Sequence, residues 1–354
     1  VTGVQTCALP ISEEGLKNRL IRRRLSNGPA TATKKRVLSF ETPAALAKLA
    51  NTPVNQTRQD ALLAYIIPWF EKDREKATQW VAAKLNGYVL AKTAGAVARE
   101  WSKKDPAAAA EWVRQIPPFW RDFVIALGSE WAAENPQEIA PLVMKWPDNQ
   151  RRQVILRGVC ESWAQKDPTA ALAWIDGLPL GNSRTEARKG LVVGWSLQDE
   201  AGCRAWVEKL ANGEEKQQAK HYILHGLARS KPQAALKELS ALSEEPGSNG
   251  FYCFAKEWAL VDPAAAGEWA KSLPEGEAKE AALQALLRQW VYLDAVRVGD
   301  WAAQLPEKAS REAALEAVME KWVEQNQTEA VAWTQGMKDP SKKSEALVAM
   351  VKAW

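Results

Sequence analysis

The chain has 354 residues, of which 25% are charged, and its formal net charge is +4 at pH 7. No apolar run reaches the roughly 18 residues that a helix needs to cross a bilayer. The sequence also lacks the G-x-S-x-G, P-loop and Gly-rich dinucleotide motifs. It therefore gives no signal for the common hydrolase, phosphate-binding or dinucleotide-binding sites.

Residues 1–12, VTGVQTCALPIS, resemble the translation of a common sequencing-adapter oligonucleotide. We expect this segment to be an artefact, which is excluded from reasoning about the fold. The natural N-terminus, with any signal peptide or anchor, would then lie outside this sequence, and the sequence does not distinguish a bacterial cytoplasm from a periplasm. Without Cys7, the remaining cysteines are far apart, lack C-x-x-C spacing and are expected in the core: Cys160, Cys203 and Cys253.

Residues 13–37 form a basic arm, with eight Lys or Arg residues between Lys17 and Arg36 and no acidic one in that interval. We predict a flexible, solvated arm. The alternative is contact with an acidic surface on a nucleic acid, a membrane or a protein. Removing the arm lowers the basic count from 47 to 39 and the acidic count from 43 to 41, so the rest carries about −2. A body this close to neutrality argues against a groove that follows phosphates.

Residues 38–354 repeat one pattern with a period near 32 residues. A Trp begins almost every unit and a second Trp follows eleven residues later, which predicts an array of stacked repeats. The units start near residues 38, 69, 101, 131, 163, 195, 227, 258, 290 and 322. The leading column is Trp69, Trp101, Trp131, Trp163, Trp195, Trp258, Trp290, Trp322 and Trp354. The second column is Trp80, Trp112, Trp174, Trp206, Trp269, Trp301 and Trp333.

The unit that begins at Trp163 predicts two helices. Asp167 can accept a hydrogen bond from the first turn of a helix, and Pro168 suits the first helical position. That helix stops at Pro179, and the second helix ends at the next leading Trp with an apolar stripe along one face. A single hairpin cannot bury such a stripe. We therefore predict an all-α fold, an α-solenoid of about ten antiparallel helix-hairpin repeats.

Two columns have structural explanations. The Trp rings share a face with Ala, Leu and Val columns, so we expect them to form the core rather than to stack on bases or sugars. An Asp or Asn lies four residues after the leading Trp in all but one unit of the series that starts at Trp69, and helix capping explains it. The capping column is Asp73, Asp105, Asn135, Asp167, Asp199, Asp262, Asp294 and Asn326.

Three places depart from the pattern. Pro68 is predicted to kink or end the second helix of the first unit. In the unit 227–257, Leu227 and Glu238 replace both Trp residues and the turn at 243–250 is the longest, so we expect a bend or local opening there. The chain ends on Trp354, where another unit would begin, and we expect further repeats beyond it.

Segments such as WAQKDPTAALAWIDGLP (163–179) and WALVDPAAAGEWAKSLP (258–274) resemble tandem Trp/Asp-Pro repeats of uncharacterised bacterial proteins. The two-helix period also resembles α-solenoids of the tetratricopeptide and HEAT types, although it is shorter and the tetratricopeptide Gly/Tyr/Ala pattern is absent. The resemblance covers residues 69–354. It implies a helical-repeat architecture and no particular activity.

His221 and His225 are the only histidines, and their i, i+4 spacing in HYILH can hold a metal. The Glu of H-E-x-x-H is missing, and the same columns elsewhere hold ordinary polar residues. We therefore expect two solvent-facing histidines and no metal, cofactor or catalytic residue. Polar columns that vary beside constant core columns are the candidate partner-facing residues: Arg157, Glu161, His221, His225, Gln284, Arg288, Glu316 and Glu320.

The pattern favours a non-catalytic scaffold for a protein or peptide, because solenoids present an extended concave surface. One alternative is an enzyme in which the hairpins close into an α/α toroid around a cavity lined by carboxylates. Another is an RNA reader that recognises one base per repeat, which the near-neutral body disfavours.

Overall fold

The computed structural model describes residues 56–354 except 86, 117–120, 212 and 243–247. The adapter-like segment, the basic arm and the first helix of the first unit lie outside these residues, as does most of the long turn at 243–250. The described part is built of helices and contains no strand, so the prediction of an all-α fold is confirmed. Within it, no helix is both long enough and apolar enough to cross a membrane.

In chain order the helices are α3 (Gln56–Lys72), α4 (Arg74–Lys84), α5 (Gly87–Ser102), α6 (Pro106–Gln115), α7 (Arg121–Trp131), α8 (Pro136–Met144), α9 (Gln150–Lys166), α10 (Pro168–Asp176), α11 (Asn182–Gln198), α12 (Glu200–Lys209), α13 (Glu214–Ser230), α14 (Pro232–Leu242), α15 (Ser248–Ala259), α16 (Pro263–Ser272), α17 (Glu277–Leu293), α18 (Ala295–Ala302), α19 (Lys308–Gly336) and α20 (Pro340–Ala353).

The capping column sets the corners between helices. Asp167 leaves the helical conformation at φ −146° and ψ 86°, and its carboxylate accepts a hydrogen bond from the Ala170 amide at 2.9 Å. At Asn326, a similar non-helical backbone divides α19 into two segments. The same side-chain bond to the residue three positions on forms at Asp73, Asp105, Asp199, Asp262, Asp294 and Asn326. Asn135 is the exception and makes no side-chain cap bond.

The expectation that the helix could end at Pro68 is wrong, because α3 continues through it to Lys72. Proline removes one backbone donor and leaves the carbonyl four residues earlier without its helical partner. Here that carbonyl belongs to Ala64, and Ala64 and Pro68 are both exposed. Water can therefore satisfy the carbonyl, and the helix need not end.

The two Trp rings of one unit pack against each other, with centroids between 5.3 Å (Trp322 and Trp333) and 6.1 Å (Trp69 and Trp80). In the unit that starts at Trp131, the second ring comes from Trp146, which stacks on Trp131 at 6.2 Å. The column rings are buried or packed against the core, except the terminal Trp354. The prediction that these columns form the core is confirmed for the others.

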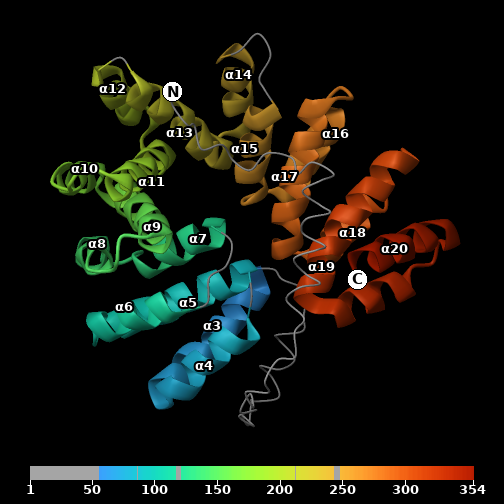
Figure 1. Ribbon diagram of the computed structural model, residues 1–354, viewed down its shortest axis with the longest axis horizontal. Coiled ribbons are helices and arrows are strands. Elements are labelled where there is room, and N and C mark those ends of the chain that lie inside the picture. The colour runs from blue at the N-terminus through green and yellow to red at the C-terminus, as the bar shows by residue number, and fades with distance from the viewer. Residues whose placement is uncertain (1–55, 86, 117–120, 212, 243–247) are drawn as a thin grey trace, which may run out of the picture. The chain divides into compact units, whose positions relative to one another are not determined.

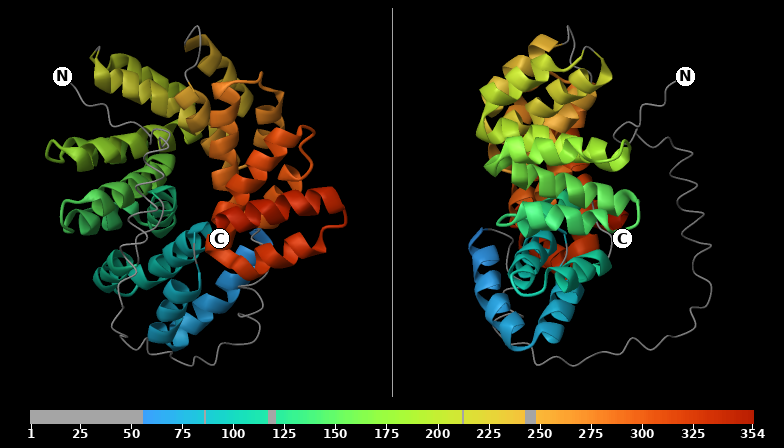
Figure 2. Two further views of the ribbon diagram at one scale, coloured as in Figure 1. Left: turned by 45° about the vertical axis from the view of Figure 1, so that its right-hand side comes forward. Right: turned by 90° about the vertical axis from the view of Figure 1, so that its left-hand side faces the viewer.

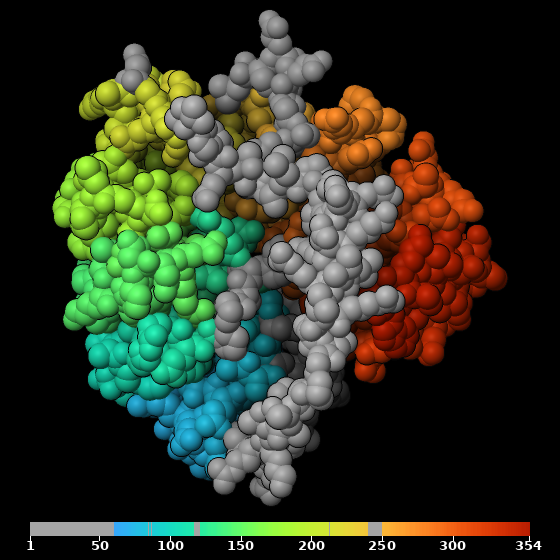
Figure 3. Space-filling view, in the orientation of Figure 1, coloured from blue at the N-terminus to red at the C-terminus, as the bar shows by residue number. Residues whose placement is uncertain are grey.

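Two sets of helices alternate along the chain (Figure 1). We call α5, α7, α9, α11, α13, α15 and α17 the inner helices, because each packs against the next one in this series. The even-numbered helices from α4 to α18, the outer helices, lie toward the periphery, as the turned views also show (Figure 2). In the space-filling view, successive hairpins form adjacent bands of colour (Figure 3).

Inner helices approach until their backbones touch. A Cβ atom at Gly158 of α9 would overlap the carbonyl oxygen of Ile125 in α7, and one at Gly190 of α11 would overlap that of Arg157 in α9. Glycine is therefore required at both crossings. This close approach leaves little room for side chains between two neighbouring inner helices. Their polar side chains therefore gather where several inner helices face one another.

Inner helices far apart in the sequence also meet. α17 contacts α5, and the Tyr292 ring of α17 lies 4.9 Å from the Phe123 ring of α7, edge to face. Lys256 of α15 forms an ion pair at 2.9 Å with Asp122 of α7, 134 residues earlier. The polar stripes of these helices thus face other inner helices.

Candidate functional site

Three of the eight predicted partner-facing residues are buried, namely Arg157, Glu161 and His225, which are 6%, 4% and 7% exposed. The expectation that they face solvent is wrong, because the polar stripe of an inner helix points at its neighbours. His221 is partly exposed. The other four are more accessible and lie on α17 and α19, away from this group in the sequence: Gln284, Arg288, Glu316 and Glu320.

The buried residues join a network that we call the inner charge cluster: Asp122, Arg157, Glu161, Arg229, Lys256 and Glu257. Arg229 links two units, because its guanidinium donates to Glu257 at 2.7 Å and to Glu161 at 2.6 Å. Glu257 is only 2% exposed. The formal charges of the three cations and three carboxylates cancel, and such pairing reduces the free-energy cost of burying charged groups.

The two histidines lie at the edge of this cluster. His225 Nδ1 is 2.9 Å from Glu257 Oε1, and His225 Nε2 is 3.1 Å from His221 Nε2. The pKa of Glu257 lies well below its usual value, because the attraction of Arg229 and the His225 hydrogen bond outweigh its burial. Glu257 is therefore ionised and accepts a hydrogen bond from the Nδ1–H group of His225, which leaves His225 Nε2 as an acceptor.

The surroundings lower the pKa of both imidazoles. Burial lowers the pKa of His225 to about 4 and outweighs the opposing effect of Glu257. Burial and the nearby Arg157 guanidinium also lower the pKa of His221. The Arg157 guanidinium sits 5.0 Å over the Tyr222 ring, which is itself 5.0 Å from the His225 ring. Neutral imidazole is the form that binds metals.

Cys253 of α15 completes a group that sequence analysis missed. One ligand atom from each of His221, His225 and Cys253 lies within 4.8 Å of the other two. Among the described residues, this is the group of three side chains whose ligand atoms are close enough together to hold one metal ion. Cys253 follows His221 by 32 residues, and Glu257 follows His225 by 32. Comparing the columns one period apart would have found the group, whereas the motif test within one helix did not.

Two further carboxylates on the inner helices are held ionised. Glu130 pairs with Lys92 at 3.0 Å and with Arg99, and Glu186 pairs with Arg121 at 2.5 Å. Burial by itself would raise the pKa of each carboxyl. The attraction and hydrogen bonds of these cations, together with those of Lys189 for Glu186, lower it by more, so the net pKa of both groups is below normal. Such carboxylates are poor proton donors near neutral pH.

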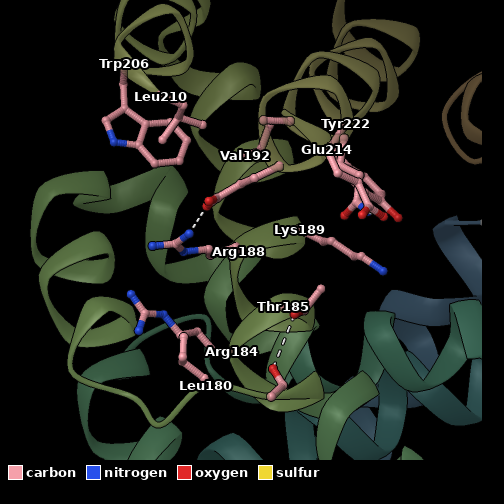
Figure 4. A pocket seen from close by; sticks show the side chains of 14 residues that line it. Leu180, Arg184, Thr185, Arg188, Lys189, Val192, Trp206, Leu210, Glu214 and Tyr222 are labelled. Atoms are coloured by element: carbon pink, nitrogen blue, oxygen red, sulfur yellow. Dashed lines mark hydrogen bonds and ion pairs between the residues drawn. The ribbon is translucent and has the colours of Figure 1, made fainter. Parts of the chain in front are cut away.

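A pocket of about 410 Å³ opens between two consecutive hairpins (Figure 4). Val192 of α11 and Trp206 and Leu210 at the end of α12 give it an apolar wall. Arg184 and Arg188 of α11 point into it from one side, and both bond Asp176, at 3.2 and 2.8 Å. The lining also includes Glu214 and Glu215, and Glu215 forms an ion pair with Arg188. The pocket thus combines apolar surface with charged groups of both signs, as ligand sites often do.

Comparisons of the chain with protein-family models, with curated proteins and with solved structures found no match. The functional conclusion therefore depends on the geometry and chemistry of this chain.

Proposed function

We propose that the chain is a non-catalytic scaffold that binds a protein or a peptide. Its architecture, in this proposal, is an α-solenoid of about ten helix-hairpin repeats. The contacts between successive inner helices and the recurring Trp pairs support the repeat arrangement. The observation that carries the binding function is the pocket between the hairpins α10–α11 and α12–α13.

The chemistry of that pocket suits a short peptide segment. Its apolar wall can cover one aliphatic or aromatic side chain. The Nε donors of Arg184 and Arg188 are buried without a hydrogen-bond partner among the described atoms, and a buried unpaired donor is costly. An incoming carboxylate would form charge-assisted bonds with these guanidinium groups in exchange for part of their present pairing with Asp176 and Glu215. Leu180, 88% exposed on the pocket lining, adds apolar contact area for a ligand.

An α/α-toroid enzyme is the second candidate, because the contact between α5 and α17 is one that a closed ring would also make. Its inner carboxylates would need to exchange protons with a substrate. Glu130, Glu186 and Glu257 are instead paired with cations that lower their pKa values. The scaffold is therefore the better supported function.

A random peptide library displayed on phage tests the proposal. The full chain should enrich peptides that carry an apolar residue next to Asp, Glu or a free C-terminus. Leu180→Asp should reduce the affinity for the enriched peptides by at least about tenfold, since it places a charge on the apolar lining and against the incoming carboxylate.

The matched control is Val261→Asp, which also alters an exposed apolar residue, 60% exposed in the turn before α16 and away from the pocket lining. It should bind the peptides as the wild type does. Failure to enrich any peptide, or equal loss of affinity in both variants, would count against peptide binding at this pocket.

A further inference from the structure

The inner charge cluster has an edge that is built differently from the rest. Most of its members form ion pairs with one another. At the edge, two imidazoles and one thiol gather from two helices, α13 and α15. Nitrogen and sulfur ligands of this kind are the ones that zinc prefers.

We propose that His221, His225 and Cys253 bind one Zn²⁺ ion, with His225 Nε2, His221 Nε2 and Cys253 Sγ as ligands. Glu257 is the outer partner that orients His225. The proposal does not rest on the peptide-binding pocket described above, although Tyr222 lines that pocket and its ring lies 5.0 Å from the His225 ring.

The nitrogen spacing suits a tetrahedral ion. Two nitrogens at ~2.0–2.1 Å from tetrahedral zinc lie about 3.3–3.4 Å apart. His225 Nε2 and His221 Nε2 are 3.1 Å apart, close to that edge length. The sulfur lies within 4.8 Å of one ring nitrogen of each histidine, so a rotation of the Cys253 side chain that moves the sulfur by roughly 1 Å brings it into range.

The neighbouring groups also favour the histidine tautomers that metal binding needs. Metal-bound histidines commonly donate their second N–H to a carboxylate, which fixes the ring and exposes the other nitrogen. The His225–Glu257 bond at 2.9 Å does this. His221 is partly exposed, so water can move its proton from Nε2 to Nδ1. On binding, the Cys253 thiol loses its proton to solvent and forms the Zn–S bond.

The types of ligand atom, nitrogen and sulfur, favour a thiolate-bound transition metal over calcium or magnesium, which need several oxygen ligands. The carboxylates of the cluster are already occupied by Arg229 and Lys256. A nucleophilic role for Cys253 fits less well, because the residue is only 5% exposed and His225 Nε2 already accepts from His221. Three protein ligands leave a fourth position for water.

Co²⁺ titration of the full chain, reduced, freed of any affinity tag and treated with chelator, tests the site. We expect one Co²⁺ per chain, with a thiolate-to-cobalt charge-transfer band and the visible bands of a tetrahedral ion, and full displacement of both by Zn²⁺. Cys253→Ser should abolish the charge-transfer band, and His221→Ala should weaken binding by at least about tenfold.

Cys203→Ala is the matched control, because Cys203 is also a buried thiol but lies on α12, outside the group. It should keep both bands. His221 lies at the surface, so His221→Ala decides the question if Cys253→Ser does not fold. Absence of stoichiometric binding, a charge-transfer band that survives Cys253→Ser, or unchanged affinity in His221→Ala would overturn the proposal.

Discussion

Single residues at the crossings of inner helices carry constraints that side-chain chemistry alone does not reveal. Gly158 lies where α9 crosses α7, and a methyl group there would meet the backbone of Ile125. Backbone atoms cannot rotate away as a flexible side chain can, so the helices must separate. Overpacking of this kind costs about 1–3 kcal/mol, and sometimes more.

We therefore predict that Gly158→Ala lowers the free energy of unfolding by about 1–3 kcal/mol in urea titrations followed by circular dichroism. Gly213→Ala is the control, since a Cβ atom there would meet nothing within 4 Å. Similar losses in both variants would show that α7 and α9 do not cross at this distance.

The partly buried carboxylate of Glu130 predicts a dependence of stability on pH. Its pKa in the folded chain lies below normal despite burial, because Lys92 and Arg99 bind the ionised form. The stabilisation is therefore present above the unfolded pKa of about 4.3 and is lost as pH falls through the folded value. Glu130→Gln should show a smaller loss of stability than the wild type between about pH 6 and pH 3. Parallel curves in urea titrations at several pH values would contradict this.

At the scale of the helix, the sequence predicted most of what the structure contains. The Asp-Pro signal located the starts of α6, α10 and α16, since a cap is a local interaction. One local expectation failed for an identifiable reason: the helix does not end at Pro68, which lies on an exposed face where water can satisfy the carbonyl that lost its partner. The period also did not reveal that Trp146, four residues after the expected column position, would stack on Trp131.

The cap itself can be tested by comparing two units. Asp167→Ala should destabilise the chain by about 1 kcal/mol, because it removes the bond to the Ala170 amide. Asn135→Ala should cost less, since Asn135 makes no such bond. Thermal unfolding measured side by side would decide, and equal losses would mean that the column is retained for another reason.

At the scale of the whole described body, the sequence predicted less. Periodicity identifies the polar face of a helix, but it does not reveal what that face meets. Arg157, Glu161 and His225 were expected in solvent for this reason, and each meets another inner helix instead. Contacts such as the one between Tyr292 and Phe123 depend on how the units curve, which one repeat does not encode.

This long-range contact predicts an energetic coupling. In a double-mutant cycle, Phe123→Leu and Tyr292→Leu should couple by about 0.5–1.5 kcal/mol, as expected for an edge-to-face aromatic pair. The two residues are 169 positions apart in the sequence, so local structure cannot produce the effect. Additive losses within error would place α7 and α17 apart in solution.

The account depends on the Trp columns packing between hairpins rather than serving as binding surfaces. Fluorine NMR of the chain labelled with 5-fluorotryptophan tests this directly, because the shift between H₂O and D₂O reports solvent contact at each ring. Trp-to-Phe variants assign the resonances. We predict a negligible solvent shift for Trp80, Trp131 and Trp322, which are at most 1% exposed, and a large one for Trp354, which is 70% exposed. Large solvent shifts for most of the 18 tryptophans would contradict the account.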